Sequence, residues 1–401
     1  MIDLYYPLRS LREGHWFKLI CGASFQHLPA IRSLALAYTL AGADCIDVAA
    51  DPAVLASVRD ALAVADSLKE EAIARGFGFR ALPWLMVSLN DGEDPHFRKA
   101  EFDPNQCPTE CPRPCEAICP ANAIVFEQLP DGYSGVIDAQ CYGCGRCLPI
   151  CPIQQILARS YVSSPSAIAP LVLQDIDAVE IHTQVGRVAE FSRLWKAIAP
   201  ALPHLKLVAI SCPDGEGLID YLKALYDLIS PLPCALIWQT DGRPMSGDIG
   251  KGATRAAIHL GQKVLDAGLP GYVQLAGGTN ASTVYKLRSR GLLRNRAIAS
   301  PLSSPGDTAR VVSSMRLSSA EQPYIAGIAY GSYARTLLSP ILDTLDTQTP
   351  MNEAPFPPTT PSSTRLEDVS PLLWQAVERA YELVSPLKAS AQMTAAASCT
   401  P

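Results

Sequence analysis

Eight cysteines of this 401-residue chain lie close together, between positions 107 and 151. Four of them have the spacing C-x2-C-x2-C-x3-C and are followed by proline: Cys141, Cys144, Cys147 and Cys151. In bacterial ferredoxin-type sequences, the first three cysteines of such a run bind one iron–sulfur cluster, and the fourth binds the other cluster where there are two. The run therefore predicts an iron–sulfur cluster.

The cysteines before this run repeat part of its pattern with wider gaps. Three residues separate each from the next, and a proline follows the last: Cys107, Cys111, Cys115 and Cys119. The repeated C-x3-C-P ending suits a two-cluster module with internal symmetry, so a second cluster is expected, as a four-iron or a three-iron form. Exchange of the fourth ligands assigns Cys141, Cys144, Cys147 and Cys119 to cluster A, and Cys107, Cys111, Cys115 and Cys151 to cluster B.

Two other interpretations of these cysteines are weaker. Paired cysteines also bind zinc, but two C-x3-C-P endings favour clusters. A disulfide framework is not expected, because the rest of the chain has the character of a cytosolic protein. Of the remaining cysteines, Cys399 lies in a C-terminal tail, and four fall in or beside apolar runs as small buried side chains: Cys21, Cys45, Cys212 and Cys234.

Composition restricts the class of protein. The chain is 48% hydrophobic and 18% charged, with a net charge of −6 and no block of basic residues, so no nucleic-acid-binding surface is expected. No run is long and apolar enough to span a bilayer, and the N-terminus lacks the pattern of a signal peptide. We therefore expect a cytoplasmic protein, in which thiolates stay reduced.

Outside the cysteine-rich stretch, apolar runs alternate with amphipathic patterns of helical spacing. The runs predict strands at residues 18–24, 43–50, 83–89, 178–182, 205–212, 234–239, 271–276 and 324–329. Eight strand–helix units over about 250 residues predict a (β/α)8 TIM-like barrel with a two-cluster ferredoxin module inserted after the third strand. An open, doubly wound parallel sheet is the competing architecture.

The predicted elements divide the chain into five parts. The barrel is formed by two of them, and a Pro/Ser/Thr-rich linker precedes a C-terminal helix whose apolar stripe is expected to pack on the body rather than to await a partner. The expected boundaries are 1–94 for the first part of the barrel, 95–160 for the iron–sulfur module, 161–342 for the second part of the barrel, 343–370 for the linker, and 371–401 for the C-terminal helix and tail.

A second candidate site lies where the last three strands end. The loop after the sixth strand carries Lys251, and the next two loops open helices with glycines: Gly277, Gly278 and Thr279, then Gly331 and Ser332. Such loops form the usual phosphate cradle of barrels, so a flavin or a phosphorylated metabolite is one interpretation. The other is an inherited, empty cradle whose glycines serve turn geometry.

Charged residues near these strand ends are interpreted as structural. His182 ends the fourth strand as a single histidine, and Asp241, Asp248 and Lys251 belong to a glycine-rich loop in which solvated charges are expected rather than a catalytic set.

The sequence resembles the LdpA, or light-dependent period, family of cyanobacteria over about residues 1–340. The resemblance rests on the two cysteine runs together with Phe17-Lys-Leu-Ile-Cys-Gly-Ala-Ser and Met245-Ser-Gly-Asp-Ile-Gly. It implies an iron–sulfur protein that reports cellular redox state to the circadian clock and associates with clock input and oscillator proteins.

The leading hypothesis is thus a redox-sensing regulatory protein rather than an enzyme. The alternative is an oxidoreductase in which the clusters exchange electrons with a flavin at the barrel mouth. A plain electron carrier ranks last, because it leaves the barrel unexplained.

Overall fold

Eight parallel strands form a closed barrel in the computed structural model, which describes residues 6–21, 27–92, 98–119, 122–127, 132–138, 140–141, 147–160, 169, 172–242, 253–294, 323–348 and 364–389. The first strand pairs with both its successor and the last strand, which closes the barrel and rules out the open sheet. Around the barrel the strands are β1 (Trp16–Ile20), β2 (Cys45–Ala49), β3 (Trp84–Asn90), β8 (Ala178–His182), β9 (Leu207–Pro213), β10 (Ala235–Asp241), β11 (Tyr272–Ala276) and β12 (Gly327–Tyr330).

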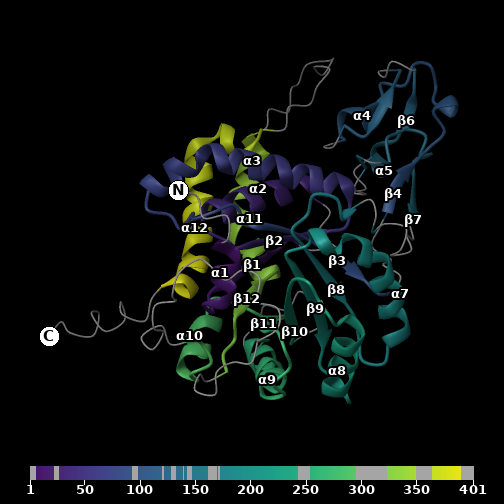
Figure 1. Ribbon diagram of the computed structural model, residues 1–401. Coiled ribbons are helices and arrows are strands. Elements are labelled where there is room, and N and C mark those ends of the chain that lie inside the picture. The colour runs from purple at the N-terminus through teal and green to yellow at the C-terminus, as the bar shows by residue number, and fades with distance from the viewer. Residues whose placement is uncertain are drawn as a thin grey trace.

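Helices follow the barrel strands and cover them on the outside (Figure 1). Asp51 begins the longest of them by accepting a hydrogen bond from the backbone N–H of Ala53 at 2.8 Å, as an N-cap residue does. The helices are α2 (Leu28–Leu40), α3 (Pro52–Ala74), α7 (Val188–Ile198) with η2 (Ala199–His204), α8 (Leu218–Ile229), α9 (Ala253–Asp266), α10 (Thr283–Ser289) and α11 (Ser332–Gln348).

The N-terminal half of the barrel interior is apolar. Trp16, Trp84, Met86 and Ile237 fill it, and α1 (Tyr6–Arg12) closes the end below them with Leu11. On β12, Gly327 leaves room for Trp16, since a Cβ at Gly327 would lie 2.6 Å from Trp16 Cδ1. Polar side chains lie above this layer, at the C-terminal ends of the strands.

The cysteine-rich stretch forms a separate lobe between β3 and β8, at the upper right of Figure 1. Its ends are joined by β4 (Arg98–Glu101), which pairs antiparallel with β7 (Leu157–Ser160). A second hairpin joins β5 (Ile124–Phe126) to β6 (Ser134–Val136), between the two cysteine groups. The described part of the lobe also contains three short helical segments: η1 (Pro104–Gln106), α4 (Pro114–Ala117) and α5 (Cys147–Ile150).

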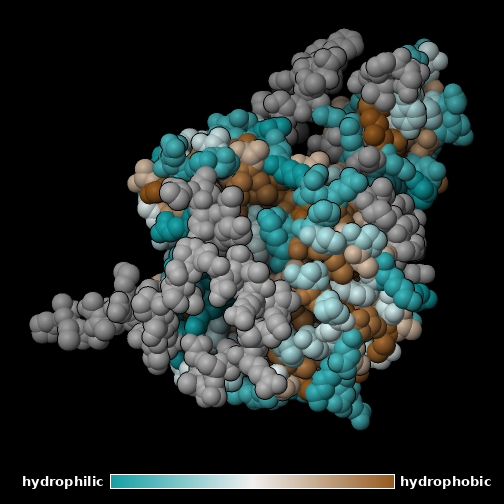
Figure 2. All heavy atoms as spheres, in the orientation of Figure 1, coloured by the Kyte–Doolittle hydropathy of each residue, from teal (hydrophilic) through white to brown (hydrophobic). Residues whose placement is uncertain are grey.

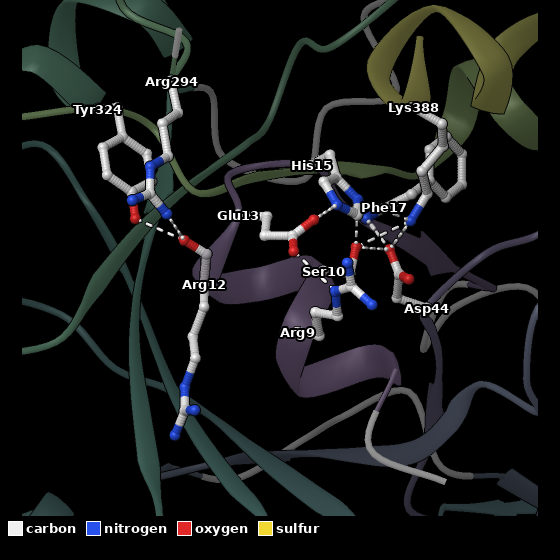
Figure 3. A network of polar contacts seen from close by, with 10 residues as sticks. All are labelled: Arg9, Ser10, Arg12, Glu13, His15, Phe17, Asp44, Arg294, Tyr324 and Lys388. Carbon is white, nitrogen blue, oxygen red and sulfur yellow. Dashed lines mark hydrogen bonds and ion pairs between the residues drawn. The ribbon is translucent and has the colours of Figure 1, made fainter. Parts of the chain in front are cut away.

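The C-terminal helix packs on the barrel, as its apolar stripe predicts. α12 (Ser370–Lys388) lies against α11 and α2 and buries Leu373, Val377, Ala380 and Val384. Its last turn reaches the N-terminal end of the barrel, where Lys388 forms an ion pair with the fully buried Asp44 and donates to Ser10 Oγ at 2.9 Å (Figure 3).

The predicted linker over 343–370 is wrong at both ends. α11 continues to Gln348 because Ile341, Leu342 and Leu345 extend its buried stripe. η4 (Leu366–Asp368) buries Leu366, and Glu367 accepts two hydrogen bonds from Arg32 on α2. Residues 349–363 lie outside the described part of the chain. Among the described helices, none is long and apolar enough to cross a membrane.

Candidate functional site

Cysteines form much of the core of the inserted lobe. Cys115, Cys119, Cys141, Cys147 and Cys151 are all buried and pack together with Ile124, Phe126 and Ile156. The two C-x3-C segments occupy equivalent places, since Cys115 lies on α4, Cys147 lies on α5, and these two short helices contact each other. Such a small core is built around its thiols rather than around apolar side chains alone.

Several N–H groups point at the cysteine sulfurs. The backbone N–H of Ala123 donates to Cys119 Sγ at 3.2 Å, and that of Ala100 donates to Cys141 Sγ at 3.4 Å. The side chain of Gln155 donates to Cys107 Sγ at 3.2 Å. Hydrogen bonds of this kind stabilise the thiolates of iron–sulfur clusters and tune their potentials, so this donor set fits such a cofactor.

The pKa shifts of the thiols indicate which of them are neighbours. Burial is the main cause of a raised pKa of Cys107, and the nearby Cys111 and Cys151 add to the increase. Burial likewise raises the pKa of Cys115 to about 11, with Cys107 and Cys111 again adding to the effect. Cys107 thus lies near Cys111 and Cys151, and Cys115 lies near Cys107 and Cys111. Among the described residues, no three of these side chains are gathered closely enough to hold a metal ion as they stand. Cys144 lies outside the described residues.

A buried lysine links the lobe to the barrel. Lys99 on β4 donates to the carbonyl oxygen of Cys141 at 2.8 Å and to that of Asp138. The same ammonium group lies 3.6 Å from Asp51 Oδ2, at the barrel end of α3. Both side chains are less than a tenth exposed. One charged group thus contacts a cysteine of the lobe and the N-cap of a barrel helix.

The upper half of the barrel interior holds a second polar site. Lys18 on β1 lies between Asp47 on β2, with 3.0 Å from Nζ to Oδ2, and Glu180 on β8, with which it forms an ion pair. Ser88 on β3 donates to Asp47 Oδ1 at 2.7 Å. Lys18 and Glu180 are fully buried.

The network continues across the other side of the barrel. Gln239 on β10 donates to Glu180 Oε1, and Gln274 on β11 donates from Nε2 to Gln239 Oε1 at 2.6 Å. Gln274 is fully buried, and its Oε1 atom has no hydrogen-bond partner among the described residues. We call Lys18, Asp47, Glu180, Gln239 and Gln274 the polar layer.

Burial and pairing oppose each other in the polar layer. Burial by itself lowers the pKa of Lys18, but Asp47 and Glu180 outweigh it and the pKa is raised, so Lys18 is charged. Burial also works against Glu180, whose pKa is nevertheless lowered by Lys18. For Asp47 burial prevails and raises the pKa. Buried ion pairs stabilise a fold little better than apolar side chains would. Groups with shifted pKa values concentrate at functional sites, which makes the polar layer a candidate site.

Two titratable side chains lie above the polar layer, at the rim. His182 Nε2 is 3.1 Å from Glu180 Oε1, so His182 belongs to the network and points toward the mouth. Asp241, for which a solvated charge was expected, is only partly exposed, and burial raises its pKa to about 6. Asp248 and Lys251 lie outside the described residues.

The predicted cradle residues gather at the ends of β11 and β12. Gly277 and Gly278 have φ of +62° and +97°, which favours glycine. Thr279 donates to the carbonyl oxygen of Ala329 at 2.6 Å and so fixes this loop to β12. Ser332 is the first residue of α11, and Gly331 directly precedes it.

The polar layer was not predicted from the sequence. Its residues were assigned only to strands, although each interrupts an apolar run at a position facing the interior: Lys18, Asp47, Glu180, Gln239 and Gln274. A charged or amide side chain in the middle of an apolar parallel strand is the signal that identifies such a layer, because polar groups are buried only with partners.

Two solved structures show weak similarity to this chain. A chain of Mycobacterium tuberculosis tryptophan synthase is 11% identical, with 97% of this chain and 99% of that chain covered and a TM-score of 0.38. (S)-3-O-geranylgeranylglyceryl phosphate synthase from Thermoplasma acidophilum is 12% identical, with 95% and 99% covered and a TM-score of 0.28.

Sequence comparison is more specific. Residues 107–162 match the LdpA Fe-S cluster-binding domain, and residues 171–386 match the Light dependent period A C-terminal domain. Light dependent period A of Synechococcus elongatus is 48% identical over 384 residues, which is 96% of this chain and 94% of that protein. The likeness therefore extends beyond position 340, its expected limit, through the packed helix α12. The chain belongs to the light dependent period A family.

Proposed function

We propose that this protein senses cellular redox state through two iron–sulfur clusters and relays it to the circadian clock, so that the clock period follows light. The observation that carries the proposal is the inserted lobe, residues 95–160, whose core is built from cysteines and which matches the iron–sulfur domain of the family. The family name supports the light-dependent period as the output.

The proposed ligand sets follow the exchanged pattern. Cluster B is assigned to Cys107, Cys111, Cys115 and Cys151, and the nearness of Cys107 to the other three supports the assignment. Cluster A is assigned to Cys141, Cys144, Cys147 and Cys119, and the burial of Cys119, Cys141 and Cys147 in one core supports it. Bound clusters would supply one-electron redox chemistry. The chain holds their thiolates and donates N–H groups to the sulfurs.

The proposed relay runs through Lys99. A change in the charge of cluster A alters the field at Lys99, which contacts the backbone of Cys141, and hence its ion pair with Asp51. Because Asp51 caps α3, the pair joins the redox state of the lobe to the packing of a barrel helix. A buried pair is only weakly screened by salt, so it suits this role.

We further propose that the partners are clock input and oscillator proteins, in the reducing cytoplasm. The lobe exposes hydrophobic side chains that a protein partner would cover: Ile118, Ile150, Ile153 and Leu157, with Leu157 67% exposed. Figure 2 shows hydrophobic atoms among hydrophilic ones on this lobe. The net charge of −6 argues against a nucleic-acid partner.

The test uses cyanobacterial cells in which this chain replaces the resident relative. Cys147→Ser should abolish adjustment of the period to light intensity, whereas Cys234→Ser, at a cysteine outside the lobe, should leave it intact. Lys99→Met should keep the iron content and lose the adjustment, and Lys99→Arg should retain both. If the Cys147→Ser protein has lost iron and the cells still adjust their clock period normally to light intensity, redox sensing is refuted.

A second candidate function is an oxidoreductase with a flavin at the barrel mouth. The observation in its favour is the polar layer beside the glycine-rich loops after β11 and β12. A yellow chromophore that remains after the clusters are removed by chelation would support this function. Visible absorption that disappears wholly with the iron would exclude a bound flavin.

A further inference from the structure

The polar layer forms an incomplete hydrogen-bonding surface. Its charges are paired within the layer, but the Oε1 atom of Gln274 faces the barrel interior as a buried acceptor without a donor among the described residues. An unpaired buried acceptor is destabilising, because it has lost its hydrogen bonds to water without gaining others. A ligand hydroxyl or amino group would supply the missing donor.

The strand that carries Gln274 leads directly to the glycine cradle. Gly277 and Gly278 follow it by three and four residues, and the N-terminus of the 17-residue helix α11 lies on the neighbouring strand–helix unit. The first N–H groups of α11 have no partner within the helix and attract anions.

A partly buried cation strengthens the cradle. Arg335, in the first turn of α11, donates to the carbonyl oxygen of Ile20 at 3.0 Å and to Ser332 Oγ at 3.1 Å. These bonds hold its guanidinium beside Gly331, where a Cβ would meet Arg335 Nη1 at 3.5 Å and nothing closer. Positive charge and helix N–H groups therefore coincide at Gly331, where a Cβ would make only ordinary van der Waals contacts.

We infer that the barrel mouth binds a small phosphorylated polyol, with its phosphate in the cradle at Gly277, Gly278 and Gly331 and a hydroxyl group on Gln274. Strand geometry gives about 10 Å between Gln274 and Gly277 along β11, the length of a molecule with a few carbon atoms. A free sugar phosphate and the ribityl phosphate of flavin mononucleotide share this chemistry. The inference deepens the second candidate function and does not depend on redox sensing.

The experiment measures binding to the cluster-loaded full-length protein by calorimetry, with ribose 5-phosphate, inorganic phosphate, ribose and flavin mononucleotide as probes. Ribose 5-phosphate should bind at least tenfold more tightly than phosphate or ribose alone. Gln274→Met should weaken ribose 5-phosphate about tenfold, the loss expected for one hydrogen bond, and leave phosphate unchanged. Iron content and thermal midpoint are checked for every variant.

Gly331 provides a matched pair of variants. Gly331→Asp should abolish binding of both ribose 5-phosphate and phosphate by placing a carboxylate in the cradle, and Gly331→Ala should preserve both, because its Cβ has room. If Gln274→Met does not fold, the two Gly331 variants still test whether the ligand binds at the barrel mouth. Binding of flavin mononucleotide alone, with the same sensitivity to Gly331→Asp, would support the site and assign it to flavin. Failure of every phosphorylated probe, or binding unaffected by Gly331→Asp, would overturn it.

Discussion

Replacing Lys18 by methionine should destabilise the barrel strongly at neutral pH. The change keeps most of the side-chain volume but removes the cation between Asp47 and Glu180, whose carboxylates are almost completely buried. Breaking a buried ion pair from one side reduces the free energy of unfolding by about 3–5 kcal/mol. Replacing the whole set, as in Lys18→Met with Asp47→Val and Glu180→Met, should restore stability to near the original value.

The loss of stability caused by Lys18→Met should depend on pH. In the intact protein, burial opposes the charge of Glu180 but Lys18 lowers its pKa, so their pairing contributes stability above the unfolded pKa that is lost as the pH falls through the folded value. Without Lys18, burial raises the pKa of both carboxyls, which then take up protons in the folded state. The deficit of Lys18→Met should therefore shrink from pH 7.5 to pH 5.5.

Urea unfolding followed by tryptophan fluorescence measures this deficit, since Trp16 and Trp84 lie directly below the polar layer. A loss under about 1 kcal/mol at pH 7.5 would contradict the assignment of Lys18 as the buried counter-ion of both carboxylates. A deficit that grows with acidity would contradict the pKa argument.

Three further perturbations test other parts of the structure. Lys388→Met should lower the free energy of unfolding by about 3 kcal/mol, because it leaves Asp44 buried without its cation, and Lys388→Arg should recover most of the loss in the same urea titration. Gln155→Leu should make the potential of cluster B more negative in a spectroscopic redox titration, because it removes an N–H donor to Cys107, and an unchanged potential would contradict the contact. Asp241 has a raised pKa of about 6, so its contribution to stability is present at low pH and lost as the pH rises through 6; Asp241→Asn should remove that part of the stability–pH profile, as followed by thermal unfolding.

The barrel was predictable because its signal is repeated. Eight apolar runs separated by helical patterns correspond to the eight strands of the closed barrel. The cysteine module was predictable for another reason: the spacing of cluster ligands is set by the cofactor and remains visible in sequence.

Other features depend on contacts between distant segments. The ion pairs Lys18–Glu180 and Lys388–Asp44 join residues that are far apart in the chain, and periodicity carries no information about such pairs. The linker boundary failed because polar and proline residues mask the buried Leu345 and Leu366. The contact of His182 with Glu180 is local, since the two lie two residues apart on β8, and it was missed because Glu180 was assigned only to the strand.

The most direct test of the central claim is to purify the protein without oxygen, quantify iron and acid-labile sulfide per chain, and record EPR spectra before and after reduction with dithionite. Two four-iron clusters predict about eight irons and two interacting signals after reduction. About seven irons, with a signal before reduction, would mean a three-iron centre in place of one of them and would keep the two-cluster account. Four or fewer irons per folded chain would contradict it.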